Sequence, residues 1–446
     1  MYRNPRRLLV TLSTLLLGTS TATADTAASM DGWPDWVRDA MAVEAKRLDY
    51  RSVTAPNDAI RSKLPGKPEA PQPIEEGWYF SSDIAAESPL ECYLFTSSRD
   101  LATLTEVIAE ANIEAVAGSP DNVGMRQVFH TGAGEVAGMP YLALEWLYTI
   151  ERDGKVLIGF TKVRAATRGE NAFVCTHNYL GYRDTLARAF AEFVGGTEIA
   201  DATAEPFYEE IARLDLNGLG TGVAYASYTT DEDGAIRMYT AEASIMPVDA
   251  ATIATSDSYT ISLSSPDGEL LNAFEISVEN GEITSNMSLS RSDEGNWISG
   301  GTLQGKELAY EIDGTSQPAS EWQQLAMARN LFAGDDTSIS TRVWMPSMDP
   351  TQFMHATMTR DDEDVTGQAL LTLGPLSYTG RFDDSGNLFD ASMAIGPVTI
   401  DIERIWSRGS LKQRGARILS PRRSSPRCWQ PATPRRTRTR PTSPRS

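Results

Sequence analysis

The chain has few of the residues on which most enzyme and metal-site motifs depend. Its 446 residues include only three cysteines and three histidines, His130, His177 and His355. It contains no glycine-rich phosphate loop, dinucleotide-binding fingerprint, nucleophile elbow or HExxH zinc motif. No motif therefore supports a nucleotide-dependent, zinc-dependent or serine-hydrolase activity. We predict no cofactor and no metal, and we interpret His355, in the strand-like segment FMHATMTR, as a sheet histidine.

Long apolar stretches are also absent, with one exception at the N-terminus. Three arginines among the first seven residues precede LLVTLSTLLLG (Leu8–Gly18), and Ala-Thr-Ala (22–24) stands before Asp25. This order is typical of a secretory signal peptide, whereas a membrane helix needs about 18–20 apolar residues. We predict cleavage after residue 24, a soluble mature chain without a membrane span, and a periplasmic or secreted location. An uncleaved N-terminal anchor is the alternative.

Basic residues are scarce in most of the chain. It holds 60 acidic and 40 basic residues, and 13 of the basic ones follow Glu403, after which no acid occurs. Nucleic-acid affinity depends on Lys and Arg that neutralise phosphates, so we expect no nucleic-acid partner. Residues 407–446 are rich in Arg, Pro and Ser. They are either a disordered basic tail or the product of a reading-frame shift, in which case the last strands of the fold would be missing.

Composition divides the rest of the chain into three parts. Residues 25–76 predict a short helix, Pro34–Leu48, and a linker rich in proline and charge, Thr54–Pro73. Residues 77–196 show strand and helix patterns in turn, and residues 206–406 show strand patterns between recurrent Gly-containing turns. We therefore predict an α+β fold class: an N-terminal antiparallel sheet with helices on one face, then an all-β meander, either a barrel or a strongly curved sheet.

The elements of residues 77–196 can be placed from periodicity and turn signals. Strands are predicted at Pro89–Thr96 and Asn171–His177, a hairpin at Asp153-Gly154, and helices at 97–112 and 181–196. In the first helix we expect Ser97 or Ser98 to be the cap and Leu101, Leu104, Val107 and Ile108 to face inward. This order of elements resembles PsbP-like domains of exported proteins. The resemblance rests on element order alone, without a motif, and implies a fold and no activity.

Within the all-β region, one helix and one acidic cluster interrupt the strand pattern. SEWQQLAMARNLF (Ser320–Phe332) predicts a helix with Ser320 as its N-cap. The run Asp361–Asp364 lacks the alternating spacing of a calcium loop, so we interpret it as an acidic hairpin tip.

The cysteines support one covalent prediction. Cys428 lies in the basic tail, so the body contains Cys92 and Cys175, both in the middle of predicted strands. Exported proteins oxidise such pairs, so we predict a Cys92–Cys175 disulfide, for which the chain-entropy model gives roughly 4–5 kcal/mol. Two alternatives stay open: a zinc site formed by both cysteines with His177 and His130, or two separate buried thiols.

Glu145 is the one carboxylate with a catalytic argument. It stands in LALEWLYTI, an almost wholly apolar strand, where burial would raise the pKa of its carboxyl. It is therefore a candidate acid or base, with a second carboxylate still to be identified. The alternative is a structural role, in which Glu145 faces a polar edge or pairs with Arg164 or Lys162 on the next strand.

These observations leave three hypotheses for the function. The first is an exported, non-catalytic protein that binds a ligand or partner, with an apolar molecule in the β-domain as the specific version. The second is a secreted hydrolase that uses carboxylates, which leave no short motif. The third is a structural or assembly component of the cell envelope, with an envelope protein as its partner.

Overall fold

The computed structural model describes residues 35–411 with seven gaps, at residues 47, 57–59, 98–99, 200–204, 361–366, 384–385 and 396–397. The predicted signal peptide, the acidic run 361–364 and residues 412–446 lie outside the described residues. The described residues belong to one compact unit.

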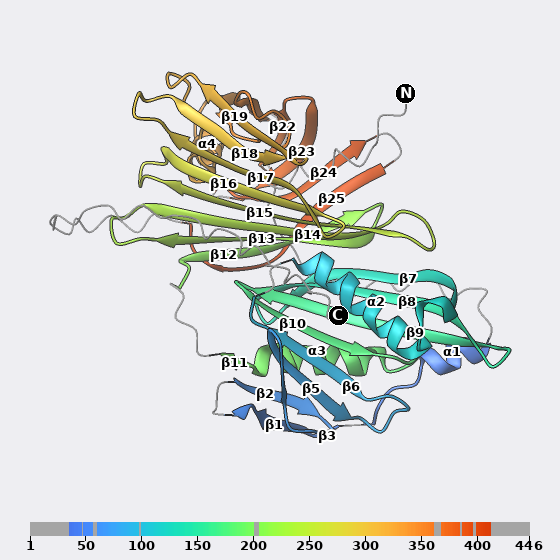
Figure 1. The fold of residues 1–446 in the computed structure, drawn as a ribbon. Coiled ribbons are helices and arrows are strands. Elements are labelled where there is room, and N and C mark those ends of the chain that lie inside the picture. The colour runs from blue at the N-terminus through green and yellow to red at the C-terminus, as the bar shows by residue number, and fades with distance from the viewer. Residues whose placement is uncertain are drawn as a thin grey trace, which may run out of the picture. The chain divides into compact units, whose positions relative to one another are not determined.

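The first sheet has eight antiparallel strands in the order β3-β5-β6-β10-β9-β8-β7, with β4 paired to β5 (Figure 1). Their bounds are β3 Lys67–Pro68, β4 Gln72–Ile74, β5 Gly77–Asp83, β6 Leu90–Phe95, β7 Val123–Val136, β8 Met139–Arg152, β9 Lys155–Arg168 and β10 Asn171–His177. The predicted hairpin is confirmed, because Asp153 (φ 53°) and Gly154 (φ 72°) form the turn between β8 and β9. These positive backbone angles explain the Asp-Gly pair.

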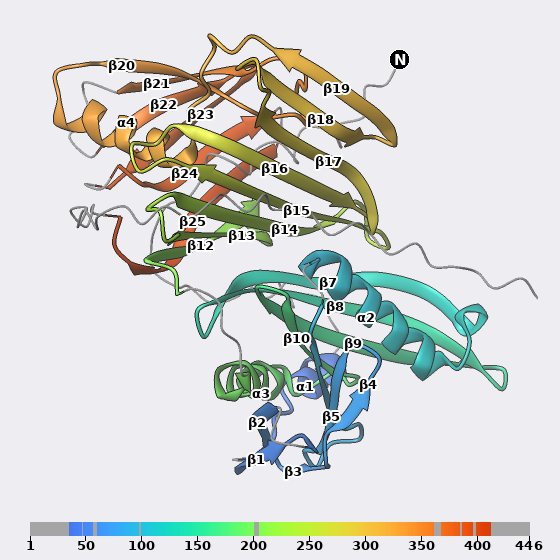
Figure 2. The same cartoon turned by 60° about the vertical axis from the view of Figure 1, so that its left-hand side comes forward.

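Two helices cover this sheet on opposite faces, α2 (Leu101–Ala117) and α3 (Arg183–Gly196) (Figure 2). Our prediction that the helices share one face is wrong in this detail. Consecutive residues of β10 point to opposite sides, so Phe173 packs in the α3 cluster and Val174 in the α2 cluster. A short 3-10 helix, Pro120–Asn122, follows α2.

Helix α2 buries a narrower face than its sequence predicts. Val107 is 55% exposed, whereas Ala102, Thr105 and Ala109 are fully buried. Most of its buried residues are small or short, with Leu101 and Ile113 as the large ones. The helix packs against strands on two sides, those of the first sheet and two strands of the second sheet. Small side chains permit that close approach.

The predicted N-terminal helix is shorter than expected, and the predicted linker is partly strand. Helix α1 covers only Asp35–Met41, and β1 (Tyr50–Thr54), β2 (Ile60–Pro65) and β11 (Glu198–Ile199) form a three-stranded sheet. Ile60 and Leu64 are buried in the same cluster as the apolar face of α3. Alternation of apolar and polar residues in IRSKLP therefore outweighs the nearby prolines.

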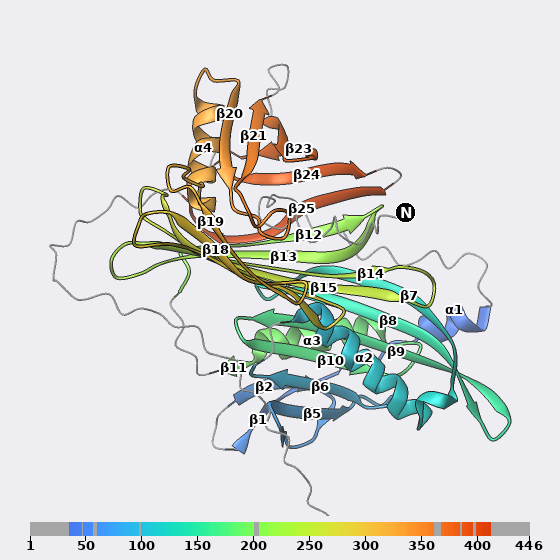
Figure 3. The same ribbon diagram turned by 45° about the horizontal axis from the view of Figure 1, so that its top comes forward.

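The second sheet has fourteen antiparallel strands in the order β19-β18-β17-β16-β15-β14-β13-β12-β25-β24-β23-β22-β21-β20. Their bounds are β12 Tyr208–Leu216, β13 Leu219–Thr230, β14 Ile236–Pro247, β15 Ile253–Ser264, β16 Leu270–Glu279, β17 Glu282–Arg291, β18 Trp297–Leu303, β19 Lys306–Ile312, β20 Ser338–Val343, β21 Met354–Arg360, β22 Gln368–Leu373, β23 Leu376–Phe382, β24 Leu388–Ile395 and β25 Val398–Gly409. The α+β fold class with an antiparallel meander is confirmed, and the sheet is curved rather than closed into a barrel (Figure 3). His355 lies in β21, as expected of a sheet histidine.

The open seam of this sheet lies in the middle of the chain. The edge strands are β19 and β20, which are consecutive strands joined by the segment that contains α4 (Glu321–Ala333). The last strand, β25, lies inside the sheet between β12 and β24. The open edges of the sheet are therefore two strands from the middle of the chain.

The fold continues past residue 406, where the composition suggested that the body ends. Strand β25 ends at Gly409, and Leu411 is 3% exposed. Arg404, the first residue of the basic segment, is buried and donates to Glu210 Oε2 at 2.8 Å and to the Tyr208 hydroxyl at 3.0 Å. This buried network ties β25 to β12.

Side chains of β15 hold the start of α2. Asp257 accepts hydrogen bonds from the backbone N–H groups of Ala102 at 2.8 Å and Thr103 at 3.0 Å. Tyr259 donates to Asp100 Oδ1 at 2.6 Å. The side chain that caps the helix therefore comes from a residue 155 positions further along the chain and not from Ser97. Ser98, the other predicted cap, lies outside the described residues. An acidic cap stabilises the unpaired N–H groups of a helix start.

Candidate functional site

The inner face of the second sheet carries small and hydroxyl-bearing residues beside α4. Strand alternation places Thr260 and Ser262 of β15, together with Ala273 and Glu275 of β16, on this face. Thr260 stands directly opposite Glu275, and Ser262 directly opposite Ala273. Short side chains at these positions leave room between the sheet and α4.

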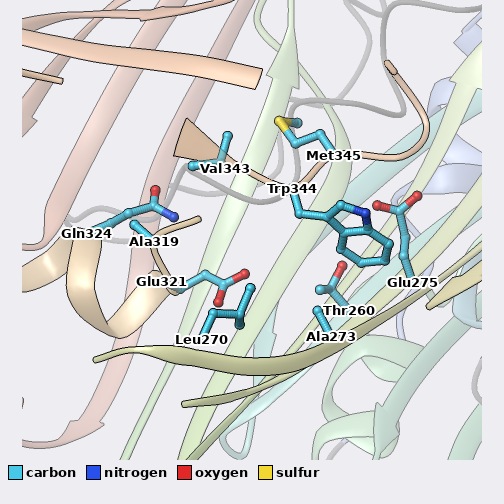
Figure 4. A pocket seen from close by; sticks show the side chains of 10 residues that line it. All are labelled: Thr260, Leu270, Ala273, Glu275, Ala319, Glu321, Gln324, Val343, Trp344 and Met345. Carbon is cyan, nitrogen blue, oxygen red and sulfur yellow. The ribbon is translucent and has the colours of Figure 1, made fainter. Parts of the chain in front are cut away.

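A cavity occupies this space. It encloses about 430 Å³ of non-atom space, part of it open to solvent, between β15, β16, the start of α4 and the end of β20. Its lining residues are Thr260, Leu270, Ala273, Glu275, Ala319, Glu321, Gln324, Val343, Trp344 and Met345 (Figure 4). In this view Glu321 and Glu275 stand on different sides, with Thr260 and the indole of Trp344 between them. About 20 Å³ of this space admits the centre of a water-sized group, which is room for about one group of the size of a water molecule or an ammonium ion.

Glu275 is a buried acid whose partners are hydroxyl groups. Glu275 is 8% exposed. Its carboxyl accepts a hydrogen bond from Ser285 Oγ at 3.4 Å and another from Ser347. Burial raises the pKa of Glu275 to about 7, and the two serines only partly oppose this rise. No ion pair with a Lys or Arg forms at Glu275 among the described residues.

Glu321 is the second acid of the cavity, in the first turn of α4. Ser262 Oγ donates to its Oε2 at 2.5 Å, and Ser320 caps the helix by accepting from the Gln323 N–H at 3.1 Å. The predicted cap is therefore confirmed. Burial also raises the pKa of Glu321, and its bond from Ser262 opposes the rise.

This arrangement is suited to receive a donor of hydrogen bonds or a cation. Two carboxyl groups, serine and threonine hydroxyls and the face of an indole surround one space, and each of these groups attracts an ammonium ion. A metal site is less suited, because among the described residues no group of three or more His, Cys, Asp or Glu side chains is placed to hold a metal ion.

A second cavity lies along the other part of α4 and is mostly apolar. It has about 410 Å³ of non-atom space, part of it open to solvent, of which about 40 Å³ admits the centre of a water-sized group. Its lining residues are Gln324, Met327, Ile339, Thr341, Ala356, Thr357, Met358, Leu371, Thr372, Leu373 and Tyr378. Gln324 lines both cavities. Tyr378 is 3% exposed, and its hydroxyl has no hydrogen-bond partner within the part of the chain that the structure describes.

Glu145, the catalytic candidate from the sequence, lies in the first sheet and lines neither cavity. It is 4% exposed, and its Oε1 accepts from Arg183 at 3.0 Å. Lys162 stands directly opposite on β9, and its Nζ donates to the backbone oxygens of Tyr179 and Gly181. The structure therefore places a cation beside Glu145, but the direct partner is Arg183 rather than Arg164 or Lys162. A catalytic role for Glu145 stays a prediction.

Four residues form a row across the first sheet. The register pairs His130 with Glu145, Glu145 with Lys162 and Lys162 with His177, on four adjacent strands. Burial lowers the pKa of Lys162 to about 7, although Glu145 opposes this, and burial with the nearby Lys162 lowers the pKa of His177 to about 3. A neutral His177 and paired charges are typical of a structural network.

Cys92 and Cys175 stand directly opposite each other on β6 and β10, and their sulfurs are 2.05 Å apart. The predicted pairing of Cys92 with Cys175 is confirmed, because the structure places the two sulfurs at the distance of a disulfide bond. Both sulfurs are used in the bond, so the zinc alternative with His177 and His130 loses its two thiolates. Both cysteines are fully buried in the cluster that includes α3.

Comparisons with known proteins give only loose likenesses. No family model and no curated protein matches the chain. Similar solved structures include a beta-barrel-like protein of the domain of unknown function DUF1849 from Brucella abortus (13% identity, TM-score 0.35, 46% of this chain and 98% of that chain) and a DUF1089 family protein from Pseudomonas aeruginosa (14%, 0.24, 37% and 87%). They also include PsbP from Synechocystis sp. PCC 6803 (10%, 0.24, 35% and 96%). The PsbP-like resemblance is matched only at this level, and such scores support no functional argument.

The described helices give one further finding. None of them is both long and apolar enough to cross a membrane.

Proposed function

We propose that the chain is an exported, non-catalytic binding protein, and that it holds a small amine-bearing ligand in the cavity beside α4. The observation that carries this proposal is Glu275, a buried carboxyl whose partners are hydroxyl groups. An ionised carboxylate in such surroundings costs free energy unless a cation or several hydrogen-bond donors accompany it. An ammonium group supplies both.

The other walls of the cavity favour the same class of ligand. Glu321 supplies a second carboxyl, and Trp344 offers an aromatic face on which a cation is attracted by the ring. Leu270 and Ala273 supply apolar surface for the body of the molecule. The ligand expected here therefore has a cationic nitrogen and a small apolar body, in place of a purely apolar molecule.

Export is part of the proposal. The N-terminal pattern of arginines, apolar residues and Ala-Thr-Ala supports it, and a disulfide-bonded pair such as Cys92–Cys175 is typical of oxidising compartments. N-terminal sequencing of the protein purified from its host is expected to begin at Asp25. A sequence that begins at Met1 would contradict export by cleavage.

Calorimetric titration with n-propylamine at pH 7.5 tests the binding site. We expect saturable binding that weakens at least about tenfold in Glu275→Gln, the size expected for loss of a charge-assisted hydrogen bond. Glu282→Gln is the matched control, because Glu282 is an exposed acid on the neighbouring strand β17. Equal affinity in wild type and Glu275→Gln, or no binding to either, would overturn the proposal.

A further inference from the structure

The two cavities follow one another along the same two elements. Helix α4 lines both, through Glu321 and Gln324 in the acidic cavity and through Gln324 and Met327 in the apolar cavity. Strand β20 also lines both, because its alternate residues Ile339 and Thr341 face the apolar cavity and Val343 faces the acidic one. Gln324 therefore lines both spaces.

The apolar cavity has one polar group that the fold leaves unused. The Tyr378 hydroxyl is buried without a partner among the described residues, while the other walls nearby are side chains such as Leu371, Leu373 and Met358. Leaving a buried hydroxyl unpaired costs about 1–3 kcal/mol, so such groups call for an explanation. A ligand group that accepts a hydrogen bond supplies one.

We propose that the apolar cavity binds the aliphatic chain of an amphiphilic amine whose ammonium group lies between Glu275 and Glu321, and that a carbonyl or similar acceptor on this chain bonds to Tyr378. This inference rests on the proposed function for the position of the head group, but it adds the class of ligand. The chain passes Gln324, whose side chain moves aside or bonds to the ligand.

Two homologous series test the position of the chain: 1-aminoalkanes from ethylamine to octylamine, and the matched neutral 1-alkanols, each titrated into the full mature protein. In the amine series we expect affinity to rise about fourfold per methylene, which corresponds to about 0.8 kcal/mol per buried CH₂ group. Thr341→Phe fills the apolar cavity and should abolish this rise while short amines still bind. Ser340→Phe is the control, because Ser340 is exposed on the other face of β20.

The outcomes separate this inference from the proposed function. Short amines that bind without any gain from chain length would overturn the chain site and keep the acidic site. Alkanols that bind as well as amines, with a gain lost in Thr341→Phe, would keep the chain site and overturn the cationic head group. No binding of either series would overturn both.

Methyl esters of ω-amino acids of increasing length test the acceptor. At one length the ester should bind about threefold to tenfold more tightly than the alkylamine of equal length, as expected for one added hydrogen bond. Tyr378→Phe should remove this preference, so that the ester and the alkylamine of equal length bind alike. Its fold is expected to be preserved, since the substitution removes an unpaired hydroxyl. An ester that gains nothing at any length would overturn the role of Tyr378.

Discussion

Buried charged groups occur in both sheets, but the row of charges in the first sheet and the cavity beside α4 in the second sheet surround them differently. In the first sheet, Glu145 contacts Arg183, and Lys162 donates to two backbone oxygens. In the second sheet, Glu275 and Glu321 are bonded to serine hydroxyls. Removing one member of the row in the first sheet leaves its buried partners unpaired, whereas a buried acid without a cation is destabilising until a ligand arrives. The difference separates a structural network from a binding site.

This comparison predicts opposite signs for mutations in the two regions. Removing a partner from the first network leaves other groups unpaired in a buried place, so the folded state should lose stability. Removing the charge of a cavity acid such as Glu275 relieves the free-energy cost of burying that charge, so the folded state should gain stability. Sites that bind ligands often reduce stability in this way.

The largest effect is expected from Lys162→Met. The change leaves the backbone oxygens of Tyr179 and Gly181 without their donor and removes one of the cations near Glu145. We expect the free energy of unfolding at pH 7 to fall by about 3–5 kcal/mol. Urea denaturation measures it, and Lys155→Met at the exposed start of β9 is the control. A loss no larger than that of the control would show that the network is not structural.

Glu275→Gln should have the opposite effect. Because the pKa of Glu275 is raised to about 7 in the folded protein, the folded state binds more protons than the unfolded state between its ordinary value of 4.5 and about 7. Stability due to this group is therefore present below pH 4.5 and is lost as the pH rises through 7. The variant should match wild type at pH 4 and exceed it by about 3 kcal/mol at pH 8.

Urea denaturation of wild type, Glu275→Gln and the exposed control Glu282→Gln at both pH values checks this expectation. A saturating amine should stabilise the wild type at pH 8 and remove most of the advantage of the variant. If Glu275→Gln is less stable than wild type at pH 8, then Glu275 stabilises the fold, and the contrast between the charges of the first sheet and the acids of the cavity is wrong.

Local sequence patterns predicted the elements that depend on nearby residues. Asn171–His177 was predicted with its observed bounds, and the Asp153-Gly154 turn and the Ser320 cap were found because each is encoded within a few residues. The facing of Cys92 and Cys175 followed from strand alternation and the small number of cysteines. In these cases the chemistry that decides the structure is visible in one short segment.

The candidate site could not be predicted in this way. Glu275 stands in NAFEISVE, an ordinary alternating strand, and its burial depends on α4 and on Trp344, which follow it in the chain by dozens of residues. Glu145 drew attention because its strand is apolar, but the cation that pairs with it, Arg183, lies at the start of a helix beyond the next two strands. A carboxylate's surroundings depend on such long-range packing, which a linear pattern does not contain.

The smallest effect is expected from Asp257→Ala. Asp257 lies between the two cases, because it is a buried acid without a cation among the described residues that the backbone N–H groups of a helix nevertheless accompany. Burial raises the pKa of Asp257 to about 7, although three hydrogen bonds from the start of α2, including one from the Thr103 hydroxyl at 2.8 Å, oppose the rise. Removal relieves the cost of the buried charge but leaves the N–H groups of Ala102 and Thr103 unpaired. We expect the free energy of unfolding to fall by about 1 kcal/mol, the usual cost of a lost helix cap.

Hydrogen exchange should show faster exchange at the first turn of α2, with Asp233→Ala at an exposed turn as control. A gain in stability like that of Glu275→Gln would mean that these backbone donors stabilise Asp257 no better than the serine hydroxyls stabilise Glu275.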